Sequence, residues 1–286
     1  MEITAPAKIN LFLSVFGKRQ DGYHDIGTLF ERISIFDRVK VDIISSSTSI
    51  EASGADIPTD ETSLLGRTIT SFRAISGKKE NFSVLVEKNI PVAAGMGGGS
   101  SDAAALLKGL NALTGKPLSP EKLEGIGAQL GADVPFFLKD VSFGLGTERG
   151  DAVREVKTDL KLSHLIVNPP LKVETKYVYS GVSGFNLTKD KAWATMLTLF
   201  LEEKNITGLS GYLRNDLQQI VLREFPQVGE AVSFLKQLGA KAALMTGSGP
   251  TVFGVFDEKD MDRAEEKTRS RFPIEKGWRV YAARTY

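Results

Sequence analysis

The first part of the chain alternates apolar and polar positions in the way that is typical of extended strands. Residues 3–15 read ITAPAKINLFLSV and residues 28–44 read TLFERISIFDRVKVDII, and both are rich in β-favouring side chains. The first strand places Lys8 and Asn10, two positions apart, on one face. A further strand is predicted over residues 81–91, NFSVLVEKNIP.

Helical spacing separates and follows these strands. Helices are predicted over SLLGRTITSFRAI at 63–75, AAALLKGLNALTG at 103–115 and KLEGIGAQL at 122–130, the last starting at Ser119-Pro120. Residues 45–61 are rich in Ser, Thr, Asp and Gly and are predicted to be an exposed connection. Residues 132–135 are predicted to be a corner between a helix and a strand.

The last third has the clearest pattern. It predicts a helix over 226–239, strands over 241–245 and 251–256, a helix over 259–272 and a strand over 278–285. This order is part of a ferredoxin-like split βαβ layout. A strand is also predicted over 164–170, where His164 is expected to be structural, and a helix over 213–225 with a cap near Asn215 or Asp216.

A charged stretch, KTDLKLS, precedes the apolar strand at 164–170, so the local composition of the chain changes there. We therefore expect two domains, at residues 1–158 and 159–286. The overall class is α+β.

Composition excludes several function classes. The 36 Lys and Arg residues nearly balance 35 Asp and Glu residues, so no global field indicates nucleic acid or a membrane surface. The absence of cysteine excludes disulfides and thiolate metal sites. No stretch approaches the roughly 18 apolar residues of a membrane span. These features favour a cytoplasmic protein.

The richest chemistry lies in residues 91–105, PVAAGMGGGSSDAAA. Ser100, Ser101 and Asp102 are good N-cap and first-turn residues, so a glycine loop is expected to run directly into a helix. The N–H groups and positive dipole end of that helix make an anion site, most plausibly for phosphate. The alternative is a flexible turn before an ordinary core helix. Neither the Walker pattern nor the dinucleotide G-x-G-x-x-G pattern fits.

Other candidates each have two interpretations. Lys8 is either a functional cation or a solvated strand lysine. Asp133 precedes the apolar run VPFFL, so it is either a half-buried carboxylate paired with a group such as Lys8 or a turn residue that caps its own backbone. Tyr23 and His24 either border a ligand or anchor their loop. The second glycine loop, residues 247–250, is either a hairpin turn or a second phosphate contact.

Six motifs occur in order along the chain and together carry a family resemblance. They are APAKINLFL at 5–13, DGYH at 21–24, PVAAGMGGGSSDAA at 91–104, LGADVPFF at 130–137, NDL at 215–217 and GSGPTVFG at 247–254. In these motifs the chain resembles the GHMP kinases, the small-molecule kinases named for galactose, homoserine, mevalonate and phosphomevalonate. APAKIN, GYH and GADVPFF are most similar to the branch that acts on a cytidyl-diphospho alcohol.

The resemblance implies a two-domain GHMP-kinase fold. Its N-terminal mixed α/β domain would carry a left-over-right phosphate loop before a helix, its C-terminal domain would be ferredoxin-like, and the active site would lie in the cleft between them. It also implies ATP as co-substrate, Mg²⁺, small-molecule partners only, and a monomer or weak homodimer.

The resemblance further implies roles for individual residues. Asp133 would be the catalytic base and Lys8 its neighbour. The ATP phosphates would be held by Pro91, Val92, Ala93, Ala94, Gly95, Met96, Gly97, Gly98, Gly99, Ser100 and Ser101, with Ser100 or Ser101 also touching Mg²⁺. The cytidyl substrate would be bound by Asn10, Tyr23, His24, Thr175, Tyr179, Gly247 and Ser248.

The chain departs from the family pattern at two places in the first glycine loop. Met96 stands where Leu is usual, which is a nearly neutral change, and Val92-Ala93-Ala94 replaces a more glycine-rich entry to the loop.

Two rival functions stay open. The rivals are a GHMP kinase for mevalonate, phosphomevalonate or homoserine, and a non-catalytic nucleotide-binding protein on the same fold. The presence of both Lys8 and Asp133 argues against the second rival, because a binding protein needs no base.

Overall fold

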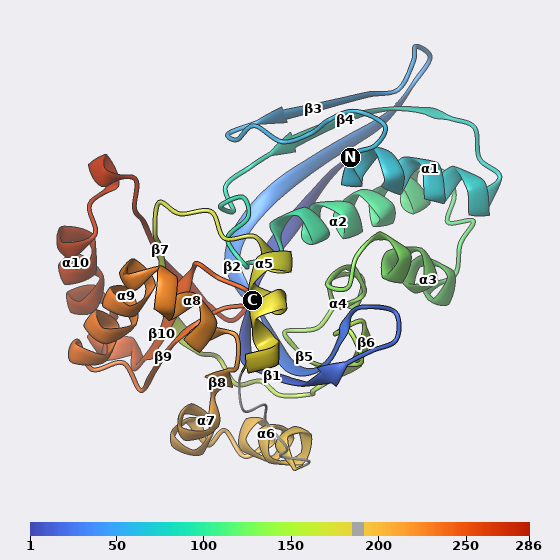
Figure 1. Ribbon diagram of the computed structural model, residues 1–286. Helices are drawn as coiled ribbons and strands as arrows, with labels where there is room; N and C mark the ends of the chain where they lie inside the picture. The colour runs from blue at the N-terminus through green and yellow to red at the C-terminus, as the bar shows by residue number, and fades with distance from the viewer. Residues whose placement is uncertain (185–191) are drawn as a thin grey trace. The chain divides into compact units, whose positions relative to one another are not determined.

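The computed structural model describes residues 1–184 and 192–286, which form two compact units (Figure 1). The first unit comprises residues 1–7, 35–92 and 97–140, and the second comprises residues 8–34, 93–96 and 141–286. The chain passes between the units within two long strands, β1 (Glu2–Lys18) and β2 (His24–Ile44). The domain boundary between residues 158 and 159 stays a prediction.

The first unit combines a sheet with four helices. Its further elements are β3 (Ser49–Ser53), α1 (Leu64–Ser76), β4 (Asn81–Glu87), α2 (Gly98–Leu113), α3 (Pro120–Leu130) and α4 (Val134–Leu138). Strand β4 pairs antiparallel with β2 and parallel with β3. Helices α1 and α2 pack side by side, and α2 also contacts α3 and α4 (Figure 1).

The helix starts of the first unit follow their predicted caps. Ser63 Oγ accepts a hydrogen bond from Gly66 N at 3.0 Å, and Ser119 Oγ accepts one from Lys122 N at 3.5 Å. Pro120 occupies the first turn of α3, where its missing N–H costs no helical hydrogen bond. Helix α1 ends at Gly77, whose φ of 72° suits glycine.

Three predicted features of this unit are wrong. The connection at residues 45–61 contains β3. The run after Asp133 is the short helix α4, because Pro135 presets a helical first turn and a short apolar run does not itself distinguish helix from strand. The N-cap of α2 is Gly97, with a φ of 70°, so neither serine caps the helix with its side chain.

The second unit holds a four-stranded sheet, several helices, and three further strands that pair with β1, with β2 or with one another. Its elements are β5 (Phe143–Thr147), β6 (Ala152–Glu155), β7 (Ser163–Asn168), α5 (Thr175–Ser180), η1 (Gly181–Gly184), α6 (Trp193–Glu202), α7 (Ile206–Tyr212), β8 (Arg214–Asn215), α8 (Gln218–Glu224), α9 (Pro226–Gln237), β9 (Ala242–Met245), β10 (Val252–Phe256), η2 (Glu258–Asp260), α10 (Met261–Arg271), η3 (Ile274–Lys276) and β11 (Arg279–Arg284).

The four-stranded sheet confirms the ferredoxin-like prediction. Its order is β11-β7-β10-β9, and all neighbours are antiparallel. In chain order this is the 4-1-3-2 arrangement of a split βαβ fold, with α9 and α10 as its two helices (Figure 1). Outside this sheet, β5 pairs antiparallel with β6 in a hairpin.

The core of the second unit lies between this sheet and its helices. Leu165 and Val167 of β7 are fully buried, as are Val228 and Leu235 of α9. The positions on α9 recur at helical spacing, so one apolar stripe of the helix faces the sheet.

His164 is structural, as predicted. It is fully buried on β7, and its Nε2 lies 2.9 Å from Glu31 Oε2. Thr285 Oγ1 donates to Glu31 Oε1 at 2.5 Å. The buried Glu31 carboxylate therefore links β2 to His164 on β7 and to Thr285, which directly follows β11.

The predicted cap of the 213–225 helix is wrong in detail. Helix α8 begins at Gln218, and Leu217 is its N-cap without a side-chain bond. Asn215 belongs to β8 instead, and its Oδ1 accepts from Leu217 N at 2.9 Å. Across the described ranges, 1–184 and 192–286, no helix has both the length and the apolar character to cross a bilayer.

Candidate active site

The two glycine loops of the sequence lie against each other in the second unit. Gly95 has a φ of 73°, and a Cβ there would lie 2.5 Å from the carbonyl oxygen of Thr246. It would also lie 3.1 Å from the carbonyl oxygen of Gly249. Only glycine fits this conformation and this approach.

The first glycine loop leads into α2 with an open helix start. Ala93 and Gly97 also have positive φ, of 55° and 70°. Ser101 N donates to Gly97 O at 2.9 Å, the first helical bond, and no side chain caps the start. The N–H groups of the first turn are therefore directed toward the loop and suit an anion.

Lys8 and Asn10 lie on one face of β1, as predicted, and both are buried. Lys8 Nζ donates to Asn10 Oδ1 at 2.6 Å, and Asn10 Nδ2 donates to Thr28 Oγ1 at 2.7 Å. Asn10 N donates to Thr246 Oγ1 at 2.8 Å. The interpretation of Lys8 as a solvated lysine is wrong, because its side chain is held in a buried polar network beside the second glycine loop.

Helix α5 brings together four of the residues predicted to bind substrate. Thr175 and Tyr179 are four positions apart and therefore share a face. Thr175 Oγ1 lies 2.9 Å from Ser248 Oγ, and the Tyr179 ring lies 5.3 Å from the His24 ring. Burial, and to a smaller extent the charge of Lys18, lowers the pKa of His24.

Tyr23 is the most exposed of the predicted site residues with an aromatic ring. Its side chain is 56% exposed, and the Arg149 guanidinium lies 5.2 Å from its ring centroid. The ring is therefore accessible at the surface of the second unit.

Asp133 is half-buried at the start of α4, directly before the buried run that begins at Val134. Its side chain makes no capping hydrogen bond at the start of α4, and the two interpretations of Asp133 stay predictions. Ser100 Oγ lies 3.8 Å from where a Cβ on Gly131 would be. The start of α2 and the corner that carries Asp133 are therefore neighbours within the first unit.

Asn215 and Thr246 contribute to this site although the residue-level predictions gave them no role. Asn215 Nδ2 donates to the carbonyl oxygens of Met245, at 2.7 Å, and Gly247, at 2.8 Å, and so braces the second glycine loop. The sequence signals for Asn215 were the NDL motif and the helix cap predicted near it.

A buried ionic cluster lies behind the start of α2. Lys88 Nζ donates to Asp102 Oδ2 at 2.6 Å and also to Asp37 Oδ2. The side chains of these three residues are at most 4% exposed. Sequence reasoning missed the cluster because Asp102 resembled a first-turn residue of the helix.

Burial raises the pKa of the Asp102 carboxyl to about 7, and Asp37 adds to this effect while Lys88 opposes it. Asp102 Oδ1 and the hydroxyl of Ser101 are buried and have no hydrogen-bond partner among the described residues. Asp102 is therefore strained electrostatically when it is ionised.

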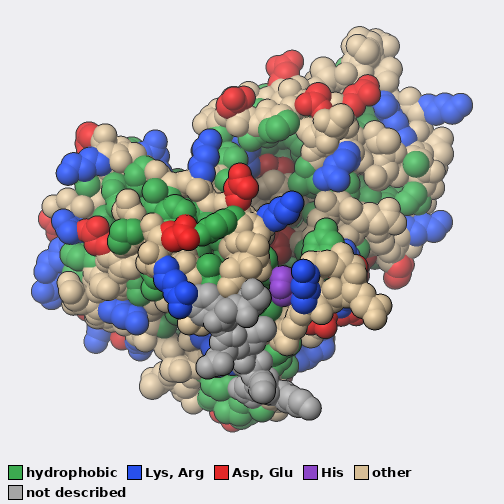
Figure 2. All heavy atoms as spheres, viewed as in Figure 1, with side chains coloured by type: hydrophobic (Ala, Val, Ile, Leu, Met, Phe, Trp, Pro, Cys, Tyr) green, Lys and Arg blue, Asp and Glu red, His purple; other side chains and the backbone are tan. Residues whose placement is uncertain are grey.

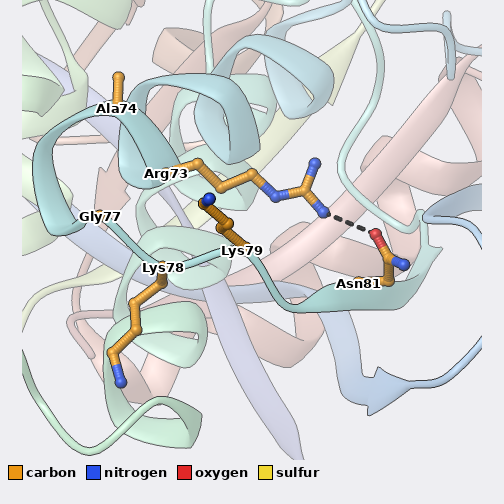
Figure 3. Close-up of a pocket in the computed structure, with 6 residues that line it drawn as sticks. All are labelled: Arg73, Ala74, Gly77, Lys78, Lys79 and Asn81. Carbon is orange, nitrogen blue, oxygen red and sulfur yellow. Dashed lines mark hydrogen bonds between the residues drawn. The ribbon is translucent and has the colours of Figure 1, made fainter.

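A surface pocket at the end of α1 is separate from these groups. It is lined by Arg73, Ala74, Gly77, Lys78, Lys79 and Asn81 (Figure 3). Arg73 donates to Asn81 Oδ1 at 3.1 Å and to Glu80 O, so its guanidinium secures the chain between α1 and β4. The pocket contains none of the predicted site residues.

Basic and acidic side chains are interspersed over the face that Figure 2 shows, as the near-zero net charge implies.

Comparison with known proteins decides the family. The GHMP kinases N terminal domain matches residues 63–140 and the GHMP kinases C terminal domain matches residues 197–274. A 4-diphosphocytidyl-2-C-methyl-D-erythritol kinase from Syntrophotalea carbinolica is 38% identical over 97% of this chain and 96% of its own. The chain belongs to the GHMP kinase family, in the branch of these kinases.

Solved structures agree with this assignment. A crystal structure of 4-(cytidine 5'-diphospho)-2C-methyl-D-erythritol kinase is 32% identical, with a TM-score of 0.82 over 99% of this chain and 98% of that one. Mevalonate kinase from Methanococcus jannaschii has a TM-score of 0.72 at 13% identity, with coverage of 100% and 98%, and shares the fold. The sequence resemblance is therefore confirmed at the level of the branch, and the GHMP-kinase fold is confirmed with it.

The approach of Gly95 to Thr246 predicts a sharp effect of one methyl group. Gly95→Ala should weaken ATP binding at least tenfold, because the added Cβ meets a backbone carbonyl and φ is positive. Isothermal titration with ATP measures this. Gly125→Ala is the control, since Gly125 lies on α3 outside the loop and a Cβ there would meet nothing within 4 Å, so this variant should bind ATP normally. Equal affinities of the two variants would contradict the steric argument.

The raised pKa of Asp102 predicts a pH-dependent stability. The folded value of about 7 exceeds the unfolded value of 3.8, so the contribution of this group to stability is complete below pH 3.8 and is lost as pH rises through 7. Asp102→Asn should be more stable than the wild type at alkaline pH, by about 1–3 kcal/mol.

Urea unfolding across this pH range measures the difference in free energy of unfolding between Asp102→Asn and the wild type. This difference should become smaller toward acid pH. Asp56→Asn is the control, because Asp56 is exposed, and its effect should stay within about 0.5 kcal/mol of zero. If the gain in free energy of unfolding of Asp102→Asn over the wild type grew toward acid pH, the predicted direction of the pH dependence would be wrong.

Proposed function

We propose that the protein transfers the γ-phosphoryl group of ATP to the 2-hydroxyl of 4-diphosphocytidyl-2-C-methyl-D-erythritol, a step of the non-mevalonate isoprenoid pathway. The products are ADP and the 2-phosphate. The observation that carries the proposal is a glycine loop that opens onto an uncapped helix start, in a chain whose full-length relatives have this enzyme name. These relatives favour this acceptor over mevalonate, phosphomevalonate or homoserine.

Phosphoryl transfer depends on positioning and on neutralising charge more than on covalent chemistry. Residues 91–101 are proposed to hold the ATP phosphates with backbone N–H groups and the start of α2. This assignment is supported by the absence of a side-chain cap on α2 and by the positive φ at Gly95 and Gly97.

Asp133 is proposed as the base that accepts the proton of the substrate hydroxyl. Its carboxylate is half-buried and is not used to cap α4. Lys8 is proposed to steady the substrate oxygen and the phosphoryl charge. Its ammonium is buried in the second unit, where Asn10 fixes its position with a hydrogen bond of 2.6 Å.

The cytidyl substrate is proposed to contact Asn10, Tyr23, His24, Thr175, Tyr179, Gly247 and Ser248. Support comes from the contacts of His24 with Tyr179 and of Thr175 with Ser248. An aromatic pair with one polar edge suits a nucleobase, which offers both a π face and hydrogen-bonding groups.

Mg²⁺ is proposed to accompany ATP, and it would neutralise charge on the phosphates when bound. Of the two serines at the start of α2, Ser100 fits better, because it is partly exposed and near the corner that carries Asp133. The Ser101 side chain is only 1% exposed. We further propose that the protein works in the cytoplasm as a monomer or weak homodimer, without nucleic-acid or membrane partners.

The test is an ADP-release assay with ATP and Mg²⁺ against the cytidyl alcohol, mevalonate and homoserine. The proposal expects turnover with the first acceptor and at least 100-fold lower kcat/KM with the others. Turnover with mevalonate or homoserine instead would overturn the assignment of the acceptor, and ATP binding without any turnover would favour a non-catalytic role.

The role of Asp133 predicts a defect in chemistry without a defect in folding. Asp133→Asn should keep its melting temperature within a few degrees and lower kcat about 10²- to 10⁴-fold, because the amide cannot accept the hydroxyl proton. Lys8→Ala should be comparably impaired in turnover. Near wild-type kcat in either variant would remove that residue from the mechanism. Asp140→Asn, an exposed aspartate near the end of α4, serves as the control.

A further inference from the structure

The cluster of Asp37, Lys88 and Asp102 joins three elements of the first unit. Asp37 comes from β2, Lys88 directly follows β4, and Asp102 lies in the second turn of α2. The Lys88 ammonium donates to a carboxylate oxygen on each side, at 2.6 Å to Asp102. All three side chains are withdrawn from solvent.

The cluster holds both ends of the glycine loop. On the entry side, Asp37 Oδ1 accepts from Asn89 N at 2.6 Å and from Ile90 N at 2.8 Å, which fixes the chain immediately before Pro91. On the exit side, Asp102 fixes the beginning of α2. A segment with four glycines among residues 95–99 is thus tied at its two ends to one ammonium group.

Stability alone does not account for this arrangement. Burying one ammonium and two carboxylates costs solvation, and well-packed apolar side chains often serve stability equally well. Lys88 Nζ also lies 3.4 Å from where a Cβ on Gly98 would be, so the cation is beside the positive end of α2. The two carboxylates offset this repulsion and keep the ammonium in place.

We propose that Asp102 is a positioning residue for nucleotide phosphates. Through Lys88 and Asp37 it holds the glycine loop in one conformation before ATP arrives. Without this tie, part of the binding energy is spent on ordering the loop. The inference rests on the proposed function only in taking ATP as the ligand of this loop.

The test measures direct ATP binding by titration calorimetry and, in parallel, hydrogen exchange of the peptide that covers residues 89–100. Asp102→Ala should weaken ATP binding about tenfold, equivalent to ordering roughly one residue, and speed exchange in this peptide. Asp102→Asn should bind ATP within about threefold of the wild type, because its amide oxygen still accepts from Lys88.

Asn111→Ala is the matched control, because Asn111 is also buried on α2 and bonds Leu118 through both of its side-chain polar atoms, at the far end of the helix. It should lower the melting temperature without changing the affinity for ATP or the exchange of residues 89–100. Should Asp102→Ala fail to fold, Asp102→Leu keeps the number and branching of the side-chain heavy atoms while it removes the acceptor, and it should show the same loss of affinity.

A folded alanine or leucine variant with wild-type affinity for ATP would overturn the inference, whatever its melting temperature. Loss of affinity in Asp102→Asn equal to that in Asp102→Ala would also overturn it, because the hydrogen bond to Lys88 would then be irrelevant. A wild-type protein that binds no ATP would instead refute the proposed function itself. The two failures are therefore distinguishable.

Discussion

The contact between two backbones at Gly95 and Thr246 is the constraint on which the arrangement of the glycine loops in the second unit depends. A carbonyl oxygen that lies 2.5 Å from where a Cβ would be leaves no room for any side chain. Strand β1 is hydrogen-bonded to both glycine loops. Lys8 N donates to Met96 O in the first loop, and Asn10 N donates to Thr246 Oγ1 beside the second. The polar face of β1 is thereby set against the glycine loops by two hydrogen bonds. The bond from Lys8 N to Met96 O joins backbone atoms, so no rotamer change can remove it.

Much of the fold was predictable from periodicity, because long strands and amphipathic helices repeat their signal many times. The ferredoxin-like sheet and the shared face of Lys8 and Asn10 are of this kind. Short elements carry too few repeats. The five residues of α4 and the five of β3 were missed for this reason. The N-cap at Gly97 was missed because a glycine cap depends on backbone φ, whereas serines nearby offered the usual chemical signal.

The candidate site was predictable residue by residue but not as a set of contacts. Thr175 and Ser248 are 73 positions apart, and Lys88 and Asp37 are 51 apart, so no local pattern relates them. The motifs identified Asn10, His24 and Ser248 as site residues, but they did not indicate which residues each of them contacts. Asp102 shows the limit most clearly, since its type suits a helix start and only tertiary structure reveals its buried ammonium partner.

The buried group around Glu31 has a consequence for how the chain is made. The sheet of the second unit has β11 at one edge, beside β7, and Thr285 then closes onto Glu31. A ribosome releases β7 long before β11, so throughout that interval one edge of β7 lacks its partner strand. Unpaired strand edges recruit other chains. The second unit therefore completes its sheet only after translation has reached Thr285, and a nascent chain halted before Arg279 carries an open edge beside a buried carboxylate.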